Sequence, residues 1–250
     1  MAWFEVNLYS KALQKDTVFE VLMPDIKEIE GKKCPCLLLL HGKGDNQTKW
    51  LRRTSVERYA KKHKLAVIMP DARKSFYTNM MYGGGEYWQY ISEEIPEKTR
   101  KIFPSLSDKR EDNYVAVLSM GGYGALKIAL HYPERYHRAA SFSGGVNITK
   151  RAKINVNHGK AVFGDANYIP GSENDLYHLV SFAGQSRKLP ELYLCCGTED
   201  FLYEDNWDFH CFLKEKGVDH IYEEWKGVHD WDFWDEAIKR GIEFMMGGRN

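Results

Sequence analysis

Short apolar runs of strand length alternate with stretches of helical period along most of the chain, and this alternation restricts the fold more than any other feature. Continuous apolar runs such as Cys36–Leu40 are typical of strands that are buried on both faces of a sheet. Strand–helix alternation predicts an α/β fold, in which a mostly parallel central sheet carries helices on both faces. Ligands bind such sheets at the carboxyl ends of the strands, so functional residues are expected there.

The pattern assigns most of the chain to individual elements. We expect strands at residues 18–22, 36–40, 65–69, 114–118, 139–142, 191–196 and 220–225, and helices at about 50–62, 87–102, 121–131, 204–216 and 231–246. The strand at 18–22 alternates like an antiparallel strand at one edge of the sheet, and Pro96 is a candidate kink in the helix at 87–102.

The number of domains follows from the absence of repeats and linkers in the sequence. Residues 146–188 are polar and loop-like with weak helical pieces, and could cover the site. Because the sequence has no internal repeat and no low-complexity linker, we predict one domain over residues 1–250, with a cap or cover segment within 146–188.

Composition narrows the class of binding partner. The chain has 250 residues, of which 43% are hydrophobic and 28% charged, as in ordinary globular proteins. Its 35 basic and 35 acidic side chains give a formal net charge of +0, so it has no long-range attraction to nucleic acid or to an anionic membrane. We therefore expect a small-molecule partner, no nucleic acid and no membrane, and leave homo-oligomerisation open.

Cysteine usage and the N-terminal sequence bear on location. No pair of cysteines has CxxC or zinc-ligand spacing, which predicts no metal site and favours a reducing compartment. The N-terminus lacks a basic region followed by a long apolar stretch, and the longest apolar run is too short to span a bilayer. We therefore expect a cytoplasmic protein.

Ser119 is the candidate nucleophile, because it follows a predicted buried strand and precedes a predicted helix. A serine on such a turn, written G-x-S-x-G, has its hydroxyl lifted clear of the sheet, and its neighbours must be small. Gly121 meets this demand on the helix side, whereas Val117 stands where glycine is usual on the strand side. Ser143 also lies between small residues, but no helical period follows it. Ser119 is favoured because the oxyanion of the reaction needs the free N–H groups of a helix N-terminus.

The general base and its carboxylate partner are expected further along the chain, in the order serine, acid, histidine. His229 lies in the loop between the last predicted strand and the last predicted helix, and the other histidines after Ser119 have structural explanations. Glu199 and Asp200 both follow the strand at 191–196, and Asp205 comes about one helical turn later. A short, rigid aspartate from a strand end best holds an ionised carboxylate against an imidazole, so Asp200 is favoured.

An oxyanion hole is predicted after the first buried strand. Residues 40–45 read Leu-His-Gly-Lys-Gly-Asp, and glycines allow the main chain to approach a substrate closely. A backbone N–H of this loop, together with that of Met120, would point at the developing oxyanion. The loop fails as a phosphate-binding loop, because Gly44 is followed by Asp45 and not by Lys-Ser or Lys-Thr.

Several segments together resemble one known family. They are Leu-Leu-His-Gly-Lys-Gly-Asp at 39–45, Pro-Asp-Ala-Arg-Lys-Ser-Phe-Tyr-Thr-Asn-Met at 70–80, Leu-Ser-Met-Gly-Gly-Tyr-Gly-Ala-Leu at 118–126, Gly-Thr-Glu-Asp-Phe-Leu at 197–202 and Gly-Val-His-Asp-Trp at 227–231. These segments are similar to those of the putative esterase family that includes esterase D (S-formylglutathione hydrolase), and most closely to its bacterial tributyrin esterase branch. The resemblance runs from about Phe4 to the C-terminal helix.

The resemblance implies an α/β-hydrolase fold and a serine carboxylesterase without a cofactor. It implies hydrolysis of short-chain acyl esters, acetyl to butyryl; some relatives deacetylate sugars or release hydroxycinnamates. The family's roles fall on Ser119 as nucleophile, Asp200 as acid and His229 as base, with Lys43 and Met120 as backbone oxyanion donors. Val117 departs from the family's glycine, which puts the geometry of the turn and the rate in question.

Aromatic residues are candidates for the substrate pocket, because several lie in or near loops at the same edge of the sheet. They could wall the acyl or alcohol pocket, although core packing explains each one equally well; they are Trp50, Phe76, Tyr77, Trp88 and Phe201.

Two alternative functions stay open at this point. One is a thioesterase acting on S-formylglutathione, and the other is a catalytically silent binding protein on the same fold.

Overall fold

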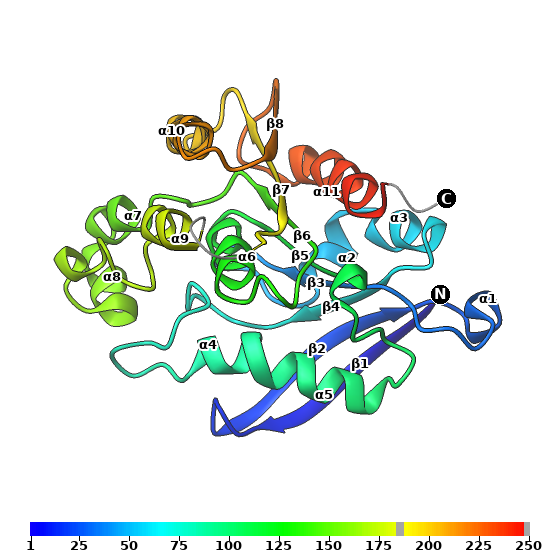
Figure 1. Ribbon diagram of the computed structural model, residues 1–250. Coiled ribbons are helices and arrows are strands. Elements are labelled where there is room, and N and C mark those ends of the chain that lie inside the picture. Colours follow the sequence, from blue (N-terminus) through cyan, green and yellow to red (C-terminus); the bar gives the residue numbers. More distant parts are fainter. Residues whose placement is uncertain (184–187, 248–250) are drawn as a thin grey trace.

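The computed structural model describes residues 1–183 and 188–247 and shows a central sheet between two layers of helices (Figure 1). The eight strands lie in the order β1-β2-β4-β3-β5-β6-β7-β8. Strands from β4 to β8 are parallel, whereas β1 and β2 are antiparallel to their neighbours. The strands are β1 (Ala2–Ser10), β2 (Lys15–Met23), β3 (Cys36–Leu40), β4 (Ala66–Pro70), β5 (Asn113–Leu118), β6 (Arg138–Phe142), β7 (Glu191–Gly197) and β8 (His220–Trp225).

The edge of the sheet differs from the prediction. The strand predicted at 18–22 exists as part of β2, but it is not at the edge, because β1 pairs along its outer side. In β1, Val6 and Leu8 pack against the core while Trp3 and Tyr9 are exposed, which is the alternation of a half-buried strand.

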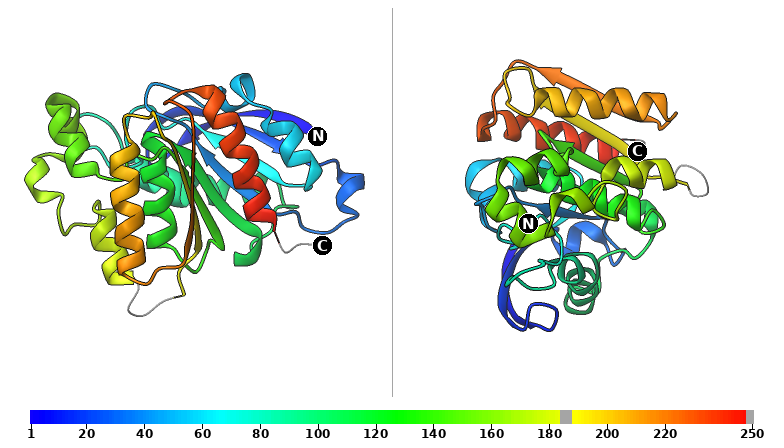
Figure 2. Two further views of the ribbon diagram at one scale, coloured as in Figure 1. Left: turned by 90° about the horizontal axis from the view of Figure 1, so that it is seen from above. Right: turned by 90° about the vertical axis from the view of Figure 1, so that its left-hand side faces the viewer.

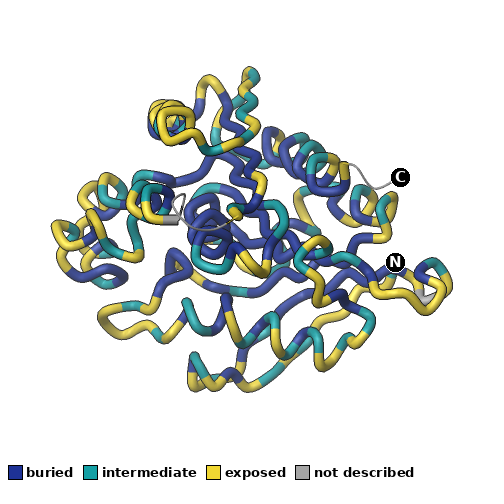
Figure 3. Tube along the Cα trace, in the orientation of Figure 1, coloured by how far each residue is buried: buried dark blue, intermediate teal, exposed yellow. Residues whose placement is uncertain are grey.

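Helices cover both faces of the sheet, and each face buries its own apolar cluster (Figures 2 and 3). The helices α2, α3 and α11 contribute to one cluster, and α5, α6, α9 and α10 contribute to the other. Their bounds are α1 (Ile26–Ile29), α2 (Lys49–Arg53), α3 (Val56–Lys62), α4 (Tyr87–Gln89), α5 (Ile95–Ile102), α6 (Met120–His131), α7 (Ile148–Ile154), α8 (Val156–Phe163), α9 (Leu176–Ala183), α10 (Tyr203–Glu215) and α11 (Trp231–Met246). Short turns of other helix types are η1 (Tyr90–Glu94), η2 (Arg110–Asp112) and η3 (Ala166–Tyr168).

The helix predicted at 50–62 is two helices, α2 and α3. Thr54 ends α2 in an extended conformation (φ −134°, ψ 171°). Its N–H and its hydroxyl both donate to the carbonyl of Trp50, at 3.1 and 2.6 Å. The side chain therefore competes with helix continuation, as threonine commonly does at helix ends.

The helix predicted at 87–102 is continuous through Pro96 but contains the π-helical turn η1. Proline has no N–H, so the carbonyl of Ser92 four residues earlier loses its helical donor. Arg135 supplies a replacement, because its Nη1 donates to that carbonyl at 3.2 Å. The wider π turn and this external donor let the helix pass Pro96.

The segment at 146–183 is more helical than predicted. It contains α7, α8, η3 and α9, and α7 and α8 lie at the side of the molecule away from α11 (Figure 1). Gly159 of α8 packs so closely on α7 that a Cβ there would lie 2.4 Å from the carbonyl oxygen of Ala152. This contact joins the two short helices.

No helix within residues 1–183 and 188–247 is both long and apolar enough to cross a lipid bilayer.

The turn from β5 into α6 is the tightest junction of the fold. A Cβ on Gly121 would lie 1.6 Å from the side-chain Cγ2 of Val117, and a Cβ on Gly122 would lie 2.2 Å from the Cα of Gly144. Val117 thus occupies the space that the bare Gly121 leaves open. The valine at this position is tolerated because the residue on the helix side is a glycine.

This packing predicts that Gly121→Ala lowers the free energy of unfolding by about 3 kcal/mol, as overpacking a tight core does. Urea denaturation measures the change. The matched control is Gly145→Ala, whose Cβ would have its nearest neighbour at 3.7 Å and should cost little. Adding Val117→Ala to Gly121→Ala should recover part of the lost stability, because it removes the clashing methyl groups. Equal destabilisation by both glycine substitutions would contradict this packing.

Candidate active site

Ser119 stands at the end of β5 in a backbone conformation that favours glycine, with φ 54° and ψ −116°. Three hydrogen bonds hold it there. Its N–H donates to the carbonyl of Phe142 at 2.9 Å, and its carbonyl accepts from the N–H groups of Gly122 and Gly145, each at 2.9 Å. Strained backbone of this kind persists only where its surroundings enforce it, and it is common at functional sites.

His229 lies in the loop between β8 and α11 and faces Ser119. Its Nε2 is 2.8 Å from the hydroxyl of Ser119, and its Nδ1 is 2.7 Å from Oδ2 of Asp200. An ionised carboxylate only accepts, so Nδ1–H donates to Asp200 and leaves Nε2 free to accept the serine proton. The rings of Phe201 and Trp234 contact the imidazole, with centroids at 4.5 and 4.8 Å.

Asp200 follows β7, and its side chain is fully buried. Its second oxygen accepts the N–H of Leu202 at 2.8 Å, which fixes the carboxylate plane. The loops after β7 and β8 touch at two glycines, since a Cβ on Gly197 would lie 2.3 Å from the carbonyl oxygen of Gly227. That carbonyl accepts the N–H of Glu199 at 3.0 Å. This contact brings the aspartate loop and the histidine loop together.

The competing residues lie elsewhere. The Glu199 carboxylate is more than half exposed and lies near Lys226. Asp205 is buried but pairs with Lys150 and Arg151 of α7, at 2.6 and 2.8 Å.

Ser143, the competing serine, has a positive φ of 46° but is fully buried. Its hydroxyl has no hydrogen-bond partner within the part of the chain that the structure describes. The structure therefore brings Ser119 and not Ser143 to a histidine.

The loop after β3 approaches Ser119 from the other side. A Cβ on Gly42 would lie 2.5 Å from Cδ1 of Leu118 and 3.6 Å from the Cβ of Ser119, so glycine lets the loop pass close to Ser119. His41 anchors this loop to the loop after β4, because its Nε2 accepts the N–H of Ala72 at 2.9 Å. Its Nδ1–H then donates to the carbonyl of Gly42 at 2.8 Å.

Two backbone N–H groups remain available beside Ser119. Those of Lys43 and Met120 have no acceptor among residues 1–183 and 188–247. Both residues line the same cleft as Ser119. Free N–H groups near a serine hydroxyl are what an oxyanion hole requires.

The Ser119 cleft has a volume of about 210 Å³ and is lined mainly by apolar side chains. Of the five aromatic residues predicted to wall it, Phe76 and Phe201 do so. The other wall comes from α7, α8 and the turn before them, through Gly145, Arg151, Ala152, Ile154, Asn155, His158, Gly159 and Phe163.

Trp50, Tyr77 and Trp88 do not line this cleft. Trp50 is fully buried and its indole N–H donates to the carbonyl of Leu40 at 2.8 Å. Tyr77 is also fully buried, and its hydroxyl donates to the carbonyl of His41 at 2.6 Å. Trp88 packs against His131 on another part of the surface, with ring centroids 4.8 Å apart. Core packing, the alternative explanation for each aromatic residue, holds for Trp50 and Tyr77, whereas Trp88 is only partly buried.

His158 of α8 is the cleft residue that the sequence did not reveal. Its Nε2 donates to the carbonyl of Lys74 at 2.7 Å, and its ring lies 5.5 Å from that of Phe76. Burial lowers the pKa of His158, and the charges of Lys43 and Lys74 lower it further. Burial and the charge of Lys74 also lower the pKa of Lys43.

No group of three or more metal-ligating side chains gathers within the described ranges, 1–183 and 188–247.

Comparison with known proteins identifies the family. A family model described as putative esterase matches residues 10–245. The chain belongs to the putative esterase family. The acetyl esterase of Caldicellulosiruptor saccharolyticus is 34% identical to this esterase over 262 residues, with 98% of each chain covered.

Solved structures agree with this relationship. The substrate-bound fluorophosphonate-binding serine hydrolase F of Staphylococcus aureus is 36% identical, with a TM-score of 0.92 and 98% of each chain covered. The S-formylglutathione hydrolase of Staphylococcus aureus is 37% identical, with a TM-score of 0.90, and the match covers 98% of this esterase and 99% of that chain. The predicted α/β-hydrolase fold is confirmed, and the protein is a serine carboxylic-ester hydrolase.

The bond between Asp200 and His229 gives a first prediction about activity. Asp200→Asn should lower kcat by about 10⁴, because an amide at this position favours the wrong imidazole tautomer. The matched control is Glu199→Gln, the neighbouring exposed carboxylate, which should leave kcat within about threefold. Steady-state hydrolysis of a chromogenic acetate ester measures both. A large loss for Glu199→Gln with little change for Asp200→Asn would reverse the assignment of the acid.

Proposed function

We propose that the esterase hydrolyses short-chain acyl esters, acetyl to butyryl, through an acyl-enzyme on Ser119. Acetylated or feruloylated sugars are included among the candidate substrates. The observation that carries the proposal is the continuous hydrogen-bonded series from Ser119 through His229 to the buried Asp200, opening on an apolar cleft. The 34% identical relative is named an acetyl esterase, which supports the acyl class.

In the acylation step, His229 takes the proton of Ser119 as the hydroxyl oxygen attacks the ester carbonyl. The N–H groups of Lys43 and Met120 stabilise the tetrahedral oxyanion. The alcohol then leaves with the proton from His229 Nε2, while Asp200 stabilises the transient imidazolium. Water repeats the sequence on the acyl-enzyme and releases the acid.

These roles fix how the substrate lies in the cleft. The leaving oxygen of the ester must be near Nε2 of His229. Phe201 lies on this side of the cleft, because its ring contacts the imidazole of His229. The carbonyl oxygen must face Lys43 and Met120. The acyl chain therefore points away from His229, toward the end of the cleft walled by Phe76 and Phe163, whose rings lie 5.8 Å apart.

The lining of the cleft supports a short acyl chain. The side chains of Phe76, Ala152 and Phe163 offer an apolar wall to an acetyl or butyryl group. We propose that the helical segment 146–183 acts as the predicted cover, because α7 and α8 supply one wall of the cleft. The single domain over 1–250, the cytoplasmic location and homo-oligomerisation stay predictions.

A second candidate activity is hydrolysis of a glutathione thioester. One 37% identical solved structure is named S-formylglutathione hydrolase. Lys43 lines the cleft, and Lys74 lines a neighbouring pocket that shares His158 with it. Neither lysine has an ion pair to the described residues, and such cations suit the carboxylates of glutathione. Comparing turnover of S-formylglutathione with that of acetate esters separates the two activities.

The central test of this function uses p-nitrophenyl acetate, butyrate and octanoate with the purified protein and its Ser119→Ala variant. Acetate and butyrate should be turned over much faster than octanoate, and Ser119→Ala should lower turnover by about 10⁶. The matched control is Ser143→Ala, another serine with positive φ whose hydroxyl lies away from the cleft, and it should keep near wild-type rates. Equal rates for wild type and Ser119→Ala would overturn the proposal.

A further inference from the structure

We propose that Lys127, a buried lysine on α6, is a positioning residue for the acyl end of the cleft. Its side-chain nitrogen holds the strained turn that carries Phe76, and so sets which acyl chains bind well. The inference rests on the proposed esterase function and adds a determinant of acyl-chain selectivity to it.

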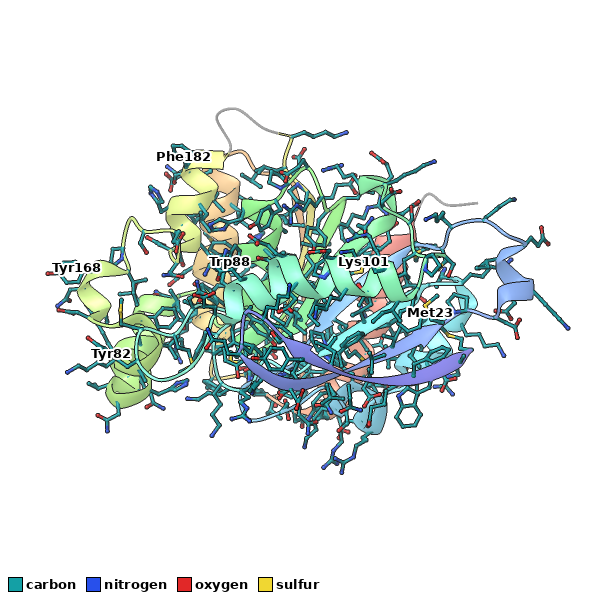
Figure 4. All side chains as sticks on the ribbon, turned by 90° about the horizontal axis from the view of Figure 1, so that it is seen from below. Met23, Tyr82, Trp88, Lys101, Tyr168 and Phe182 are labelled. Carbon is teal, nitrogen blue, oxygen red and sulfur yellow. The ribbon has the colours of Figure 1, made fainter. Side chains whose placement is uncertain are left out.

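Lys127 is almost completely buried, with 1% of its surface exposed. Its Nζ donates to Oγ1 of Thr78 at 3.1 Å and to Oδ1 of Asn174 at 2.7 Å. It also lies 4.3 Å from the ring centroid of Trp88, which Figure 4 labels at the N-terminal end of the helix formed by α4 and α5. Lysine is rarely buried without a carboxylate, and here neutral oxygens and an aromatic face take its place.

The turn that Lys127 contacts is strained. Phe76 and Tyr77 are consecutive non-glycine residues with positive φ, at 51° and 54°. Bulky residues adopt this conformation only when neighbouring contacts enforce it. Thr78 supplies one such contact, because its hydroxyl donates to the carbonyl of Phe76 at 3.1 Å while it accepts from Lys127.

Tyr77 ties the same turn to the catalytic loops. Its ring lies against Gly124 of α6, where a Cβ would come within 2.3 Å of it, and its hydroxyl donates to the carbonyl of His41. The turn is therefore fixed between α6 and the loop after β3, and Phe76 projects from it into the cleft. Loss of the Lys127 contact would loosen the Thr78 side of the turn and so the Phe76 wall, while Tyr77 still holds the loop beside Ser119.

The second acceptor, Asn174, belongs to the segment that leads into α9. Its Oδ1 also accepts from the hydroxyl of Tyr123 at 3.3 Å. Lys127 thus joins three parts of the chain: the helix that begins at the nucleophile, the turn that carries Phe76, and the segment that follows α8.

Lys127 gains or loses its proton near neutral pH. Burial lowers its pKa to about 7, against the opposing influence of Glu173. Among the described residues, His131 and Tyr123 of α6 also lie near it. Below this pKa the ammonium has three N–H donors and a positive charge over Trp88, and above it one donor and the charge are lost. The turn should be held most firmly in the protonated state.

The experiment compares wild type with Lys127→Met, which keeps an unbranched side chain as far as Cε and removes the donors. We expect KM for p-nitrophenyl butyrate to rise about tenfold, because Phe76 is no longer held against the acyl chain, while kcat for the acetate changes less than about threefold. The control is Lys101→Met, with no expected change. Lys101 is an exposed lysine of α5, which Figure 4 labels at the opposite end from Trp88 of the helix formed by α4 and α5.

A pH profile separates positioning from general stability. In the wild type, the ratio of kcat/KM for butyrate to that for acetate should fall as pH rises through about 7, because Lys127 loses its proton. Both substrates use His229, so its titration cancels in the ratio. In Lys127→Met the ratio should be low and independent of pH.

Thr78→Val serves as an independent variant should Lys127→Met fail to fold. It removes the hydroxyl that accepts from Lys127 at nearly constant shape, and should raise KM for butyrate in the same way. In the double variant, KM for butyrate should rise no further. The proposal is wrong if kcat falls equally for all esters with unchanged KM, or if the butyrate-to-acetate ratio stays constant with pH in the wild type. Absence of any turnover that depends on Ser119 would instead refute the esterase function itself.

Discussion

The conformation of Ser119 is the constraint on which the rest of the site depends. A non-glycine residue with φ 54° requires support. The carbonyl of Phe142 on β6, the N–H of Gly122 on α6 and the N–H of Gly145 after β6 supply it. Gly121 must be bare because Val117 fills the space beside it. The strain directs the hydroxyl out of the sheet, where His229 can reach it.

Convergence of neighbouring strand ends completes the site. The loop after β3 brings His41 and Gly42 to one side of Ser119, and the loops after β7 and β8 bring Asp200 and His229 to the other. Glycine allows the close approaches that hold these loops, at Gly42 against the side chain of Leu118 and between the backbones of Gly197 and Gly227. The side chains of Ser119, His229 and Asp200 are thus held in place by the fold, which the proposed mechanism requires for electrostatic stabilisation of its transition state.

The sequence was informative where local rules decide the structure. Buried parallel strands read as apolar runs, and Ser119 and Asp200 each follow such a strand. His229 follows β8, an edge strand that is only half-buried and was recognised by its alternation, so all three positions could be predicted. The roles of Ser119, Asp200 and His229 stay predictions until they are tested. β1 was overlooked although Val6 and Leu8 alternate with exposed residues, so the signal was present.

Tertiary packing decided what the sequence could not reveal. Trp50, Phe76 and Tyr77 are all aromatic residues in or near loops at the same edge of the sheet. Only the fold shows that Trp50 and Tyr77 are fully buried while Phe76 lines the cleft. His158 and Phe163 line the cleft because α7 and α8 pack beside it. No local sequence pattern predicts where these two helices pack. Lys127 looks like an ordinary helical lysine until its burial under Trp88 is known.

The most direct test of the account is covalent trapping of the nucleophile. The protein would be incubated with a fluorophosphonate, and the modified residue identified by mass spectrometry of the intact chain and its peptides. The account predicts one phosphonyl group per chain, attached to Ser119, with labelling lost on unfolding the protein beforehand. Modification of another residue, or a labelling rate that unfolding does not change, would contradict it.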